Sequence, residues 1–104
     1  MTTYALHDRV CEALGDGTRR TILEELRREP RSVAALAADL PVSRPAVSQH
    51  LRVLTEAGLV GHRQEGTRHV YHVDPDGLQP LRAWLDVFWQ DVLDTFAEYV
   101  RSTP

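Results

Sequence analysis

The sequence lacks lysine entirely and contains one cysteine, Cys11, among its 104 residues. A single cysteine excludes an internal disulfide and any metal site built from several thiolates. No apolar run approaches the ~20 residues that a membrane-spanning helix needs. The first residues, MTTYALHDRV, also lack the apolar core of a signal peptide. We therefore expect a cytoplasmic protein with one domain, residues 1–104.

Charge is distributed unevenly, although the formal net charge is only −3. Residues 40–73 contain four Arg against two Glu and four of the five His, whereas residues 74–104 contain two Arg against six acidic residues. A basic middle between acidic flanks is typical of a local nucleic-acid contact, but an excess of two charges is also within chance. Guanidinium groups bind phosphate or guanine well, yet a GC-rich coding sequence is the simpler explanation of the missing lysine. Charge alone therefore leaves the function open.

The spacing of apolar residues predicts about five helices and one β-hairpin. The signals are clearest in the stretch SRPAVSQHLRVLTEAGLV, where Ser43 is a good N-cap and Pro45 suits the first turn. Gly58 is well placed to end this helix in a Schellman motif. After it the pattern becomes extended, with Gly66 in the hairpin turn. The expected fold class is mainly α with a β-hairpin (α+β), with outer helices over 3–14 and 78–100.

Helix, tight turn, helix and hairpin in this order form a winged helix-turn-helix, whose second helix enters the DNA major groove. In the helix that starts at Ser43, an apolar line faces inward, and polar side chains lie opposite it. Arg can bind guanine or phosphate, Gln can bind adenine, and small Ser permits close approach. The predicted DNA-binding residues of this recognition helix are Ser43, Arg44, Pro45, Ser48, Gln49 and Arg52. Those of the hairpin, or wing, are Arg63, Gly66, Thr67 and Arg68.

The segment SVAALAADLPVSRPAVSQHLRVLTEAGLV closely resembles the helix-turn-helix of the ArsR/SmtB family of transcriptional repressors. ALGDGTRRTILEEL and EGTRHVYHVDP resemble the segments on either side, although Gly17 stands where the family usually has Pro. The resemblance implies a homodimeric, sequence-specific repressor on double-stranded DNA, bound to an imperfect palindrome. It also implies DNA contacts at Arg44, Pro45, Ser48 and Gln49.

The last helix is more apolar than one core-facing side requires. The excess favours a partner helix, most simply the same helix of a second subunit, over an ordinary core helix in a larger bundle. The resemblance further implies that the first and last helices join the dimer. The predicted interface residues are Leu6, Val10, Leu81, Trp84, Leu85, Phe88, Trp89, Val92 and Phe96.

Many members of that family sense metal ions, but the usual ligands are missing here. SVAALAADL has no Cys or His, and the last helix has no His. His62, His69 and His72 share the hairpin without an evident further ligand, so we expect no metal and no cofactor, and the effector is unknown. Three interpretations of Cys11 stay open: a redox switch, a disulfide with the same cysteine of a second subunit near the two-fold axis, or a small buried apolar residue.

Catalysis is not expected, because no nucleophile–base pair or phosphate loop is evident. Two alternatives to a DNA-binding repressor stay open. One is a dimeric protein-interaction module that uses the acidic last helix. The other is a repressor that senses metal or redox state through an atypical site.

Overall fold

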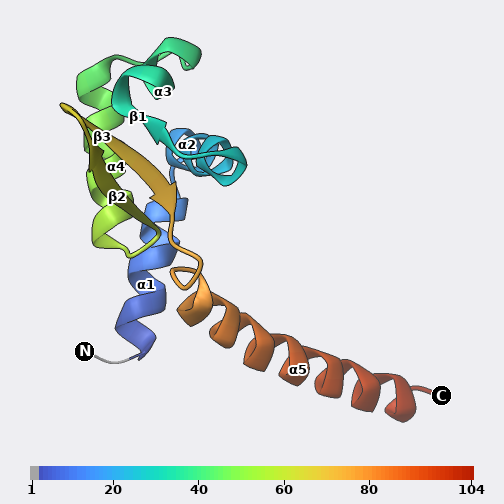
Figure 1. The fold of residues 1–104 in the computed structure, drawn as a ribbon. Coiled ribbons are helices and arrows are strands. Elements are labelled where there is room, and N and C mark those ends of the chain that lie inside the picture. Colours follow the sequence, from blue (N-terminus) through green and yellow to red (C-terminus); the bar gives the residue numbers. More distant parts are fainter. Residues whose placement is uncertain (1–2) are drawn as a thin grey trace.

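The computed structural model describes residues 3–104, with side chains from His7 onward. It confirms a mixed fold of five helices and a small antiparallel sheet (Figure 1). The predicted interface residue Leu6 lies outside the described side chains. In chain order the elements are α1 (Thr3–Leu14), α2 (Gly17–Arg28), β1 (Arg31–Ser32), α3 (Val33–Asp39), α4 (Arg44–Glu56), β2 (Val60–Glu65), β3 (Arg68–Val73) and α5 (Gln79–Ser102).

Three of the helices begin at a polar side chain that caps them. Asp16, Ser32 and Ser43 each accept a hydrogen bond from the backbone amide three residues later, at 3.0, 3.2 and 3.3 Å respectively. Each bond satisfies one amide that has no partner inside its helix. The sequence therefore sets where α2, α3 and α4 start.

The stability that the Asp16 cap adds to α2 depends on pH, because the carboxyl group of Asp16 titrates. The amide of Arg19, which donates to the carboxylate, holds the pKa of Asp16 below its ordinary value of 3.8. A carboxyl whose pKa is lowered by folding adds stability that is complete above the ordinary pKa and is lost as the pH falls through the folded pKa. Asp16→Asn keeps a capping side chain but removes this titration.

We expect the difference in unfolding free energy between wild type and Asp16→Asn to stay level down to about pH 5 and to shrink below about pH 4. Urea titrations from pH 7 to pH 3 would measure it, because the other carboxyl groups cancel in the difference. A difference that does not change across this range would contradict the assigned role of Asp16.

The C-terminal end of α4 has the predicted Schellman geometry. Gly58 has a φ of 80°, its amide donates to the carbonyl of Thr55 at 3.0 Å, and the amide of Leu59 donates to that of Leu54 at 2.9 Å. The side chains of Leu54 and Leu59 are both buried in the same core. These bonds satisfy the last carbonyls of α4 and turn the chain directly into β2.

The sheet has three strands in the order β1-β3-β2, one more than predicted. The hairpin pairs β2 with β3 from Val60↔Val73 to Glu65↔Arg68 and turns through Gly66, which has a φ of 63°. β1 adds Arg31–Ser32 to the other edge of β3. A strand of two residues is too short to show a β pattern in the sequence. The prediction of a two-stranded wing therefore left out β1.

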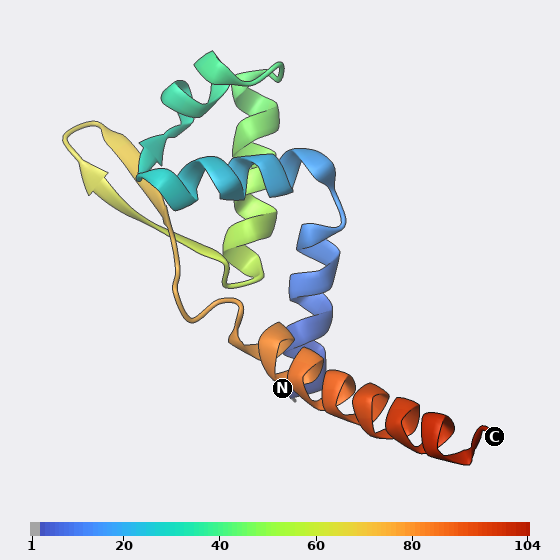
Figure 2. The ribbon, with the colours of Figure 1, turned by 90° about the vertical axis from the view of Figure 1, so that its right-hand side faces the viewer.

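The helices α1–α4 and the sheet, called the head below, enclose one core. Figure 2 shows α2 crossing α4, with the hairpin projecting to one side. Val10 is only 1% exposed within this core, so its side chain is not available to a partner and its predicted place in a dimer interface is not retained. The core residues are Val10, Ala13, Ile22, Leu26, Leu36, Val47, Leu51, Leu54, Leu59 and Val60.

Helix α5 leaves the head, and the molecule measures 66 × 30 × 20 Å as a result (Figures 1 and 2). No residue of α5 is buried within the described chain. Near its start, Trp84 stacks on Phe88 with ring centroids 5.1 Å apart and lies 5.9 Å from the ring of His7 in α1. The large apolar side chains exposed on α5 are Trp84, Leu85, Val87, Phe88, Trp89, Val92, Leu93, Phe96, Tyr99 and Val100.

Among the described residues, no helix combines the length and apolar character needed to cross a membrane.

Candidate DNA-binding surface

Helix α4 separates a buried face from an exposed face. Val47, Leu51 and Leu54 are fully buried, which fixes the rotation of the helix about its axis. The polar positions predicted for the recognition helix therefore lie together on the solvent side. These exposed residues are Arg44, Pro45, Ser48, Gln49 and Arg52.

The two arginines on this face differ in their surroundings. Within residues 3–104, Arg44 in the first turn of α4 forms no ion pair. Arg52 forms one with Glu56 on the next turn, with 3.5 Å between Nε and Oε1. Ser43 is also exposed, but its hydroxyl oxygen accepts from the amide of Ala46 as the N-cap. Ser43 thus has a structural role in addition to any contact with DNA.

The wing places its predicted residues around an exposed turn. Arg63 lies on β2, where its Nη2 atom is 3.3 Å from Oε1 of Glu65, and Arg68 begins β3 directly opposite Glu65. Gly66 and Thr67 form the tip between them. The hairpin therefore carries two guanidinium groups close to its tip, beside a single carboxylate.

The histidines of the wing form a ring cluster. The imidazoles of His62 and His69 stack with centroids 4.8 Å apart, and Tyr71 lies 5.2 Å from His62. His72 lies against Gly61 instead. Across the described residues there is no group of three or more His, Cys, Asp or Glu side chains that could hold a metal ion. The cluster therefore supplies two imidazoles where a zinc site needs three or four ligands.

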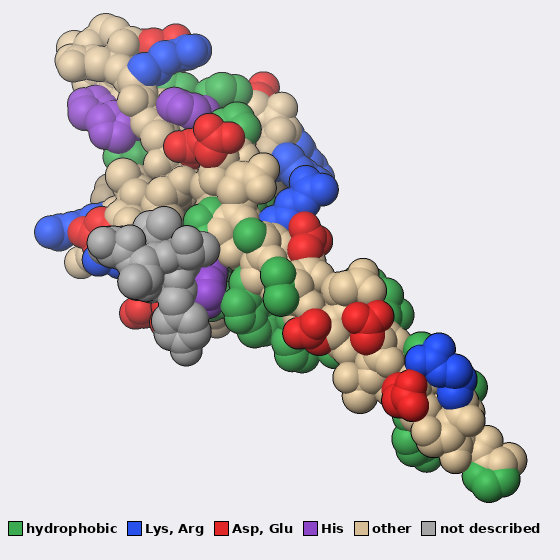
Figure 3. Space-filling view, turned by 90° about the horizontal axis from the view of Figure 1, so that it is seen from below, with side chains coloured by type: hydrophobic (Ala, Val, Ile, Leu, Met, Phe, Trp, Pro, Cys, Tyr) green, Lys and Arg blue, Asp and Glu red, His purple; other side chains and the backbone are tan. Residues whose placement is uncertain are grey.

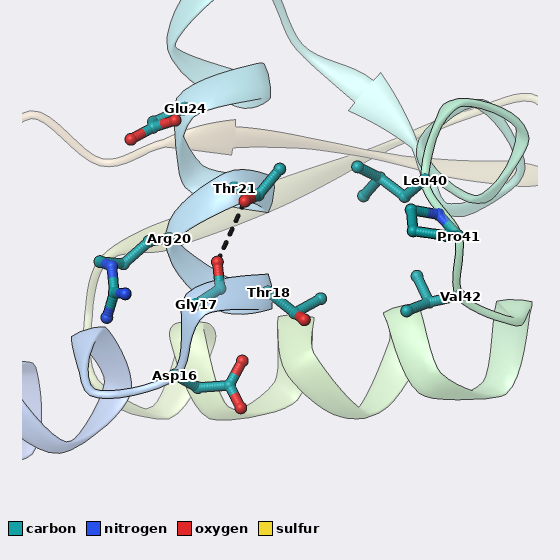
Figure 4. Close-up of a pocket in the computed structure, with 9 residues that line it drawn as sticks. All are labelled: Asp16, Gly17, Thr18, Arg20, Thr21, Glu24, Leu40, Pro41 and Val42. Carbon is teal, nitrogen blue, oxygen red and sulfur yellow. Dashed lines mark hydrogen bonds between the residues drawn. The ribbon is translucent and has the colours of Figure 1, made fainter.

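A shallow hollow lies between the start of α2 and the turn that joins α3 to α4 (Figure 4). Two of its polar side chains are used within the fold: Nη1 of Arg20 donates to the carbonyl of Leu14 at 2.6 Å, and the hydroxyl of Thr21 donates to that of Gly17 at 3.0 Å. These bonds lie at the end of α1 and at the start of α2. The residues that line the hollow are Asp16, Gly17, Thr18, Arg20, Thr21, Glu24, Leu40, Pro41 and Val42.

The structure also defines the surroundings of Cys11 and Arg19. Cys11 is exposed on α1, so the interpretation of this residue as a small buried apolar side chain was wrong. Arg19 donates to the carbonyls of Ala13 and Glu12 at 2.7 and 3.1 Å. Its guanidinium group therefore satisfies the last carbonyls of α1 and ties that helix to α2.

Known proteins share both the sequence and the shape of this chain. A family model described as a helix-turn-helix domain matches residues 14–63. The HTH-type transcriptional regulator Rv2034 of Mycobacterium tuberculosis is 55% identical over 102 residues, which cover 98% of this chain and 95% of the relative.

Solved structures agree with this assignment. An ArsR-like transcriptional regulator from Rhodococcus sp. RHA1 superimposes with a TM-score of 0.80 at 35% identity, covering 97% of this chain and 98% of the other. The homodimeric winged helix-turn-helix DNA-binding domain of Mb0332 from Mycobacterium bovis superimposes with a TM-score of 0.69 at 32% identity. The match covers 88% of this chain and 85% of the other. The chain therefore belongs to the ArsR family of winged helix-turn-helix transcriptional regulators, which are DNA-binding proteins and not enzymes.

Proposed function

We propose that the protein is a homodimeric repressor that binds an imperfect palindrome in double-stranded DNA. The observation that carries this proposal is the exposed polar face of α4, held outward by its fully buried apolar line. In a two-fold dimer this face occurs twice. The two α4 helices would then enter successive major grooves about 34–36 Å apart.

The residues of α4 have distinct proposed roles. Arg44, which is free of ion pairs with the described residues, binds guanine or a phosphate, and Gln49 binds adenine. Ser48 permits close approach of the helix to the base edges. Pro45 and Ser43 lie at the N-terminus of α4, where a backbone phosphate is bound favourably.

In the wing, Arg63 and Arg68 bind neighbouring phosphates or the minor groove, with Gly66 and Thr67 at the tip. These contacts add affinity that does not depend on the base sequence.

The dimer is proposed to form through α5 and α1, within a single domain of residues 1–104. Large apolar side chains follow the length of α5 beside acidic ones (Figure 3). Exposed apolar patches of this extent mark interaction surfaces, and the homodimeric state of Mb0332 supports a second copy as the partner. The proposed interface contains Leu81, Trp84, Leu85, Phe88, Trp89, Val92 and Phe96.

Repression would follow because the bound dimer occupies promoter DNA that polymerase needs. The protein would accordingly act in the cytoplasm, the compartment that we propose holds its target promoter.

Selection of binding sites from random DNA tests the proposal. We expect two inverted half-sites whose centres are about 10–10.5 base pairs apart. Arg44→Ala should reduce the preference for the selected operator over random DNA by about 5- to 150-fold if Arg44 binds a base. Titrations of both DNAs at one fixed salt concentration measure this ratio.

Arg101→Ala is the control, since Arg101 lies at the far end of α5 beside Glu98. Equal losses on operator and random DNA would show that Arg44 contacts phosphate alone. Selected sequences without two-fold symmetry would rule out the palindrome.

A further inference from the structure

We propose that Arg52 reads a guanine in each half-site and that Glu56 positions the Arg52 side chain for this contact. The inference rests on the proposed function, because it requires α4 to lie in the major groove. It goes further in two respects: it assigns a base to Arg52, and it gives a role to an acidic residue on the DNA-facing side.

The geometry of the pair is the first argument. Arg52 and Glu56 lie one turn apart on the exposed face of α4, with side chains 75% and 69% exposed. Their contact joins Nε of Arg52 to Oε1 of Glu56 at 3.5 Å. Both terminal nitrogens of the Arg52 guanidinium therefore remain available as donors to DNA.

Other arginines in the chain are held differently. Arg63 and Arg101 contact their carboxylates through Nη2, so one of the two terminal nitrogens is already used. Guanine presents two acceptors in the major groove, O6 and N7, that fit a pair of N–H donors from one guanidinium. A carboxylate beside Nε leaves this pair of terminal donors free of ion pairs with the described residues, so both can bind one guanine.

The charge of Glu56 is the second argument. Glu56 is exposed one turn beyond Arg52 on α4, so a DNA backbone that meets Arg52 also approaches a like charge. Repulsion of this kind penalises a complex that makes only phosphate contacts. A complex in which Arg52 binds guanine gains a contact that offsets the repulsion. Glu56 thereby increases the ratio of the affinity for the operator to the affinity for random DNA.

A purely structural role makes a different prediction. Exposed pairs one helical turn apart contribute little to stability, so removing Glu56 would leave the fold intact and the base preference unchanged. The base preference at individual positions of the operator therefore separates the two roles.

The experiment uses the operator selected for the wild-type protein and a set of duplexes that carry each single base-pair change. Affinities are measured at one salt concentration for wild type, Arg52→Ala and Glu56→Gln. The matched controls are Arg101→Ala and Glu98→Gln, which break a pair of similar exposure on α5, at 70% and 69%. Thermal unfolding of each variant confirms that it is folded.

We expect Arg52→Ala to reduce discrimination at one guanine pair per half-site by about 5- to 150-fold. Glu56→Gln should relax the same pair by a smaller factor and raise affinity for random DNA severalfold, because a like charge is gone. The two control variants should change neither quantity.

Three results would overturn the inference. Uniform weakening by Arg52→Ala on all sequences, with the salt slope reduced by about one, would place Arg52 on a phosphate. An unchanged base preference in Glu56→Gln would remove the positioning role. If the wild-type protein selects no sequence at all, the proposed function fails first and the inference fails with it.

Discussion

Phe96→Asp is expected to convert the dimer into monomers and to weaken binding to a two-half-site operator by about 100-fold or more. Phe96 is 62% exposed on the distal part of α5, far along the helix from the head. A carboxylate there would have to be buried without a partner in the interface, which costs several kcal/mol. The monomer would keep its fold but lose the avidity that two linked heads provide, typically a factor of about 10²–10⁴.

Val87→Asp is the matched control for this variant. Val87 is 65% exposed on the same helix, but it precedes Phe96 by about 2.5 turns and therefore faces the opposite side. Sedimentation velocity and operator titration should show a dimer with unchanged affinity. A dimeric Phe96→Asp variant, or a Val87→Asp variant that dissociates, would place the interface on another face of α5.

Gly77→Ala is expected to destabilise the head by about 3 kcal/mol. A methyl group on Gly77 would collide with the carbonyl oxygen of Gly58 and lie 2.9 Å from Cα of Leu59. Both contacts are with backbone atoms, held by the hydrogen bonds that end α4. Relief of the clash would therefore disturb either the end of α4 or the start of α5. Urea unfolding followed by circular dichroism measures the loss.

Gly66→Ala provides the comparison, because nothing lies within 4 Å of the added methyl group although φ is 63°. Only the cost of a left-handed backbone remains there, about 1–2 kcal/mol. If Gly77→Ala costs no more than Gly66→Ala, the close packing of Gly77 against the end of α4 is not a source of stability.

The helix-turn-helix could be predicted from the sequence because its signals are local. Ser43, Pro45 and Gly58 fix both ends of α4 within a few residues of chain. β1 could not be found in the same way. It consists of Arg31–Ser32 and exists only through pairing with Val70 and Tyr71 of β3, far along the chain.

The candidate site was predictable to a similar degree. Helical periodicity was enough to indicate the exposed face of α4. The Arg52–Glu56 pair was missed, although its spacing of four residues is a readable signal. Periodicity could not indicate whether an apolar stripe packs against the core of the same protomer or against a partner. Val10 packs in the core of its own protomer, whereas Phe96 remains exposed.

The direct passage from α4 into the wing restricts how DNA binding can be controlled. Leu59 alone separates Gly58 from β2, and its carbonyl accepts from the amide of Asp74 at the end of β3. The recognition helix and the hairpin are thus joined by one residue whose amide and carbonyl are both hydrogen-bonded. In the proposed dimer, a signal that releases DNA has little room to reshape either head. It would act on the distance and angle between the two heads, which α1 and α5 determine.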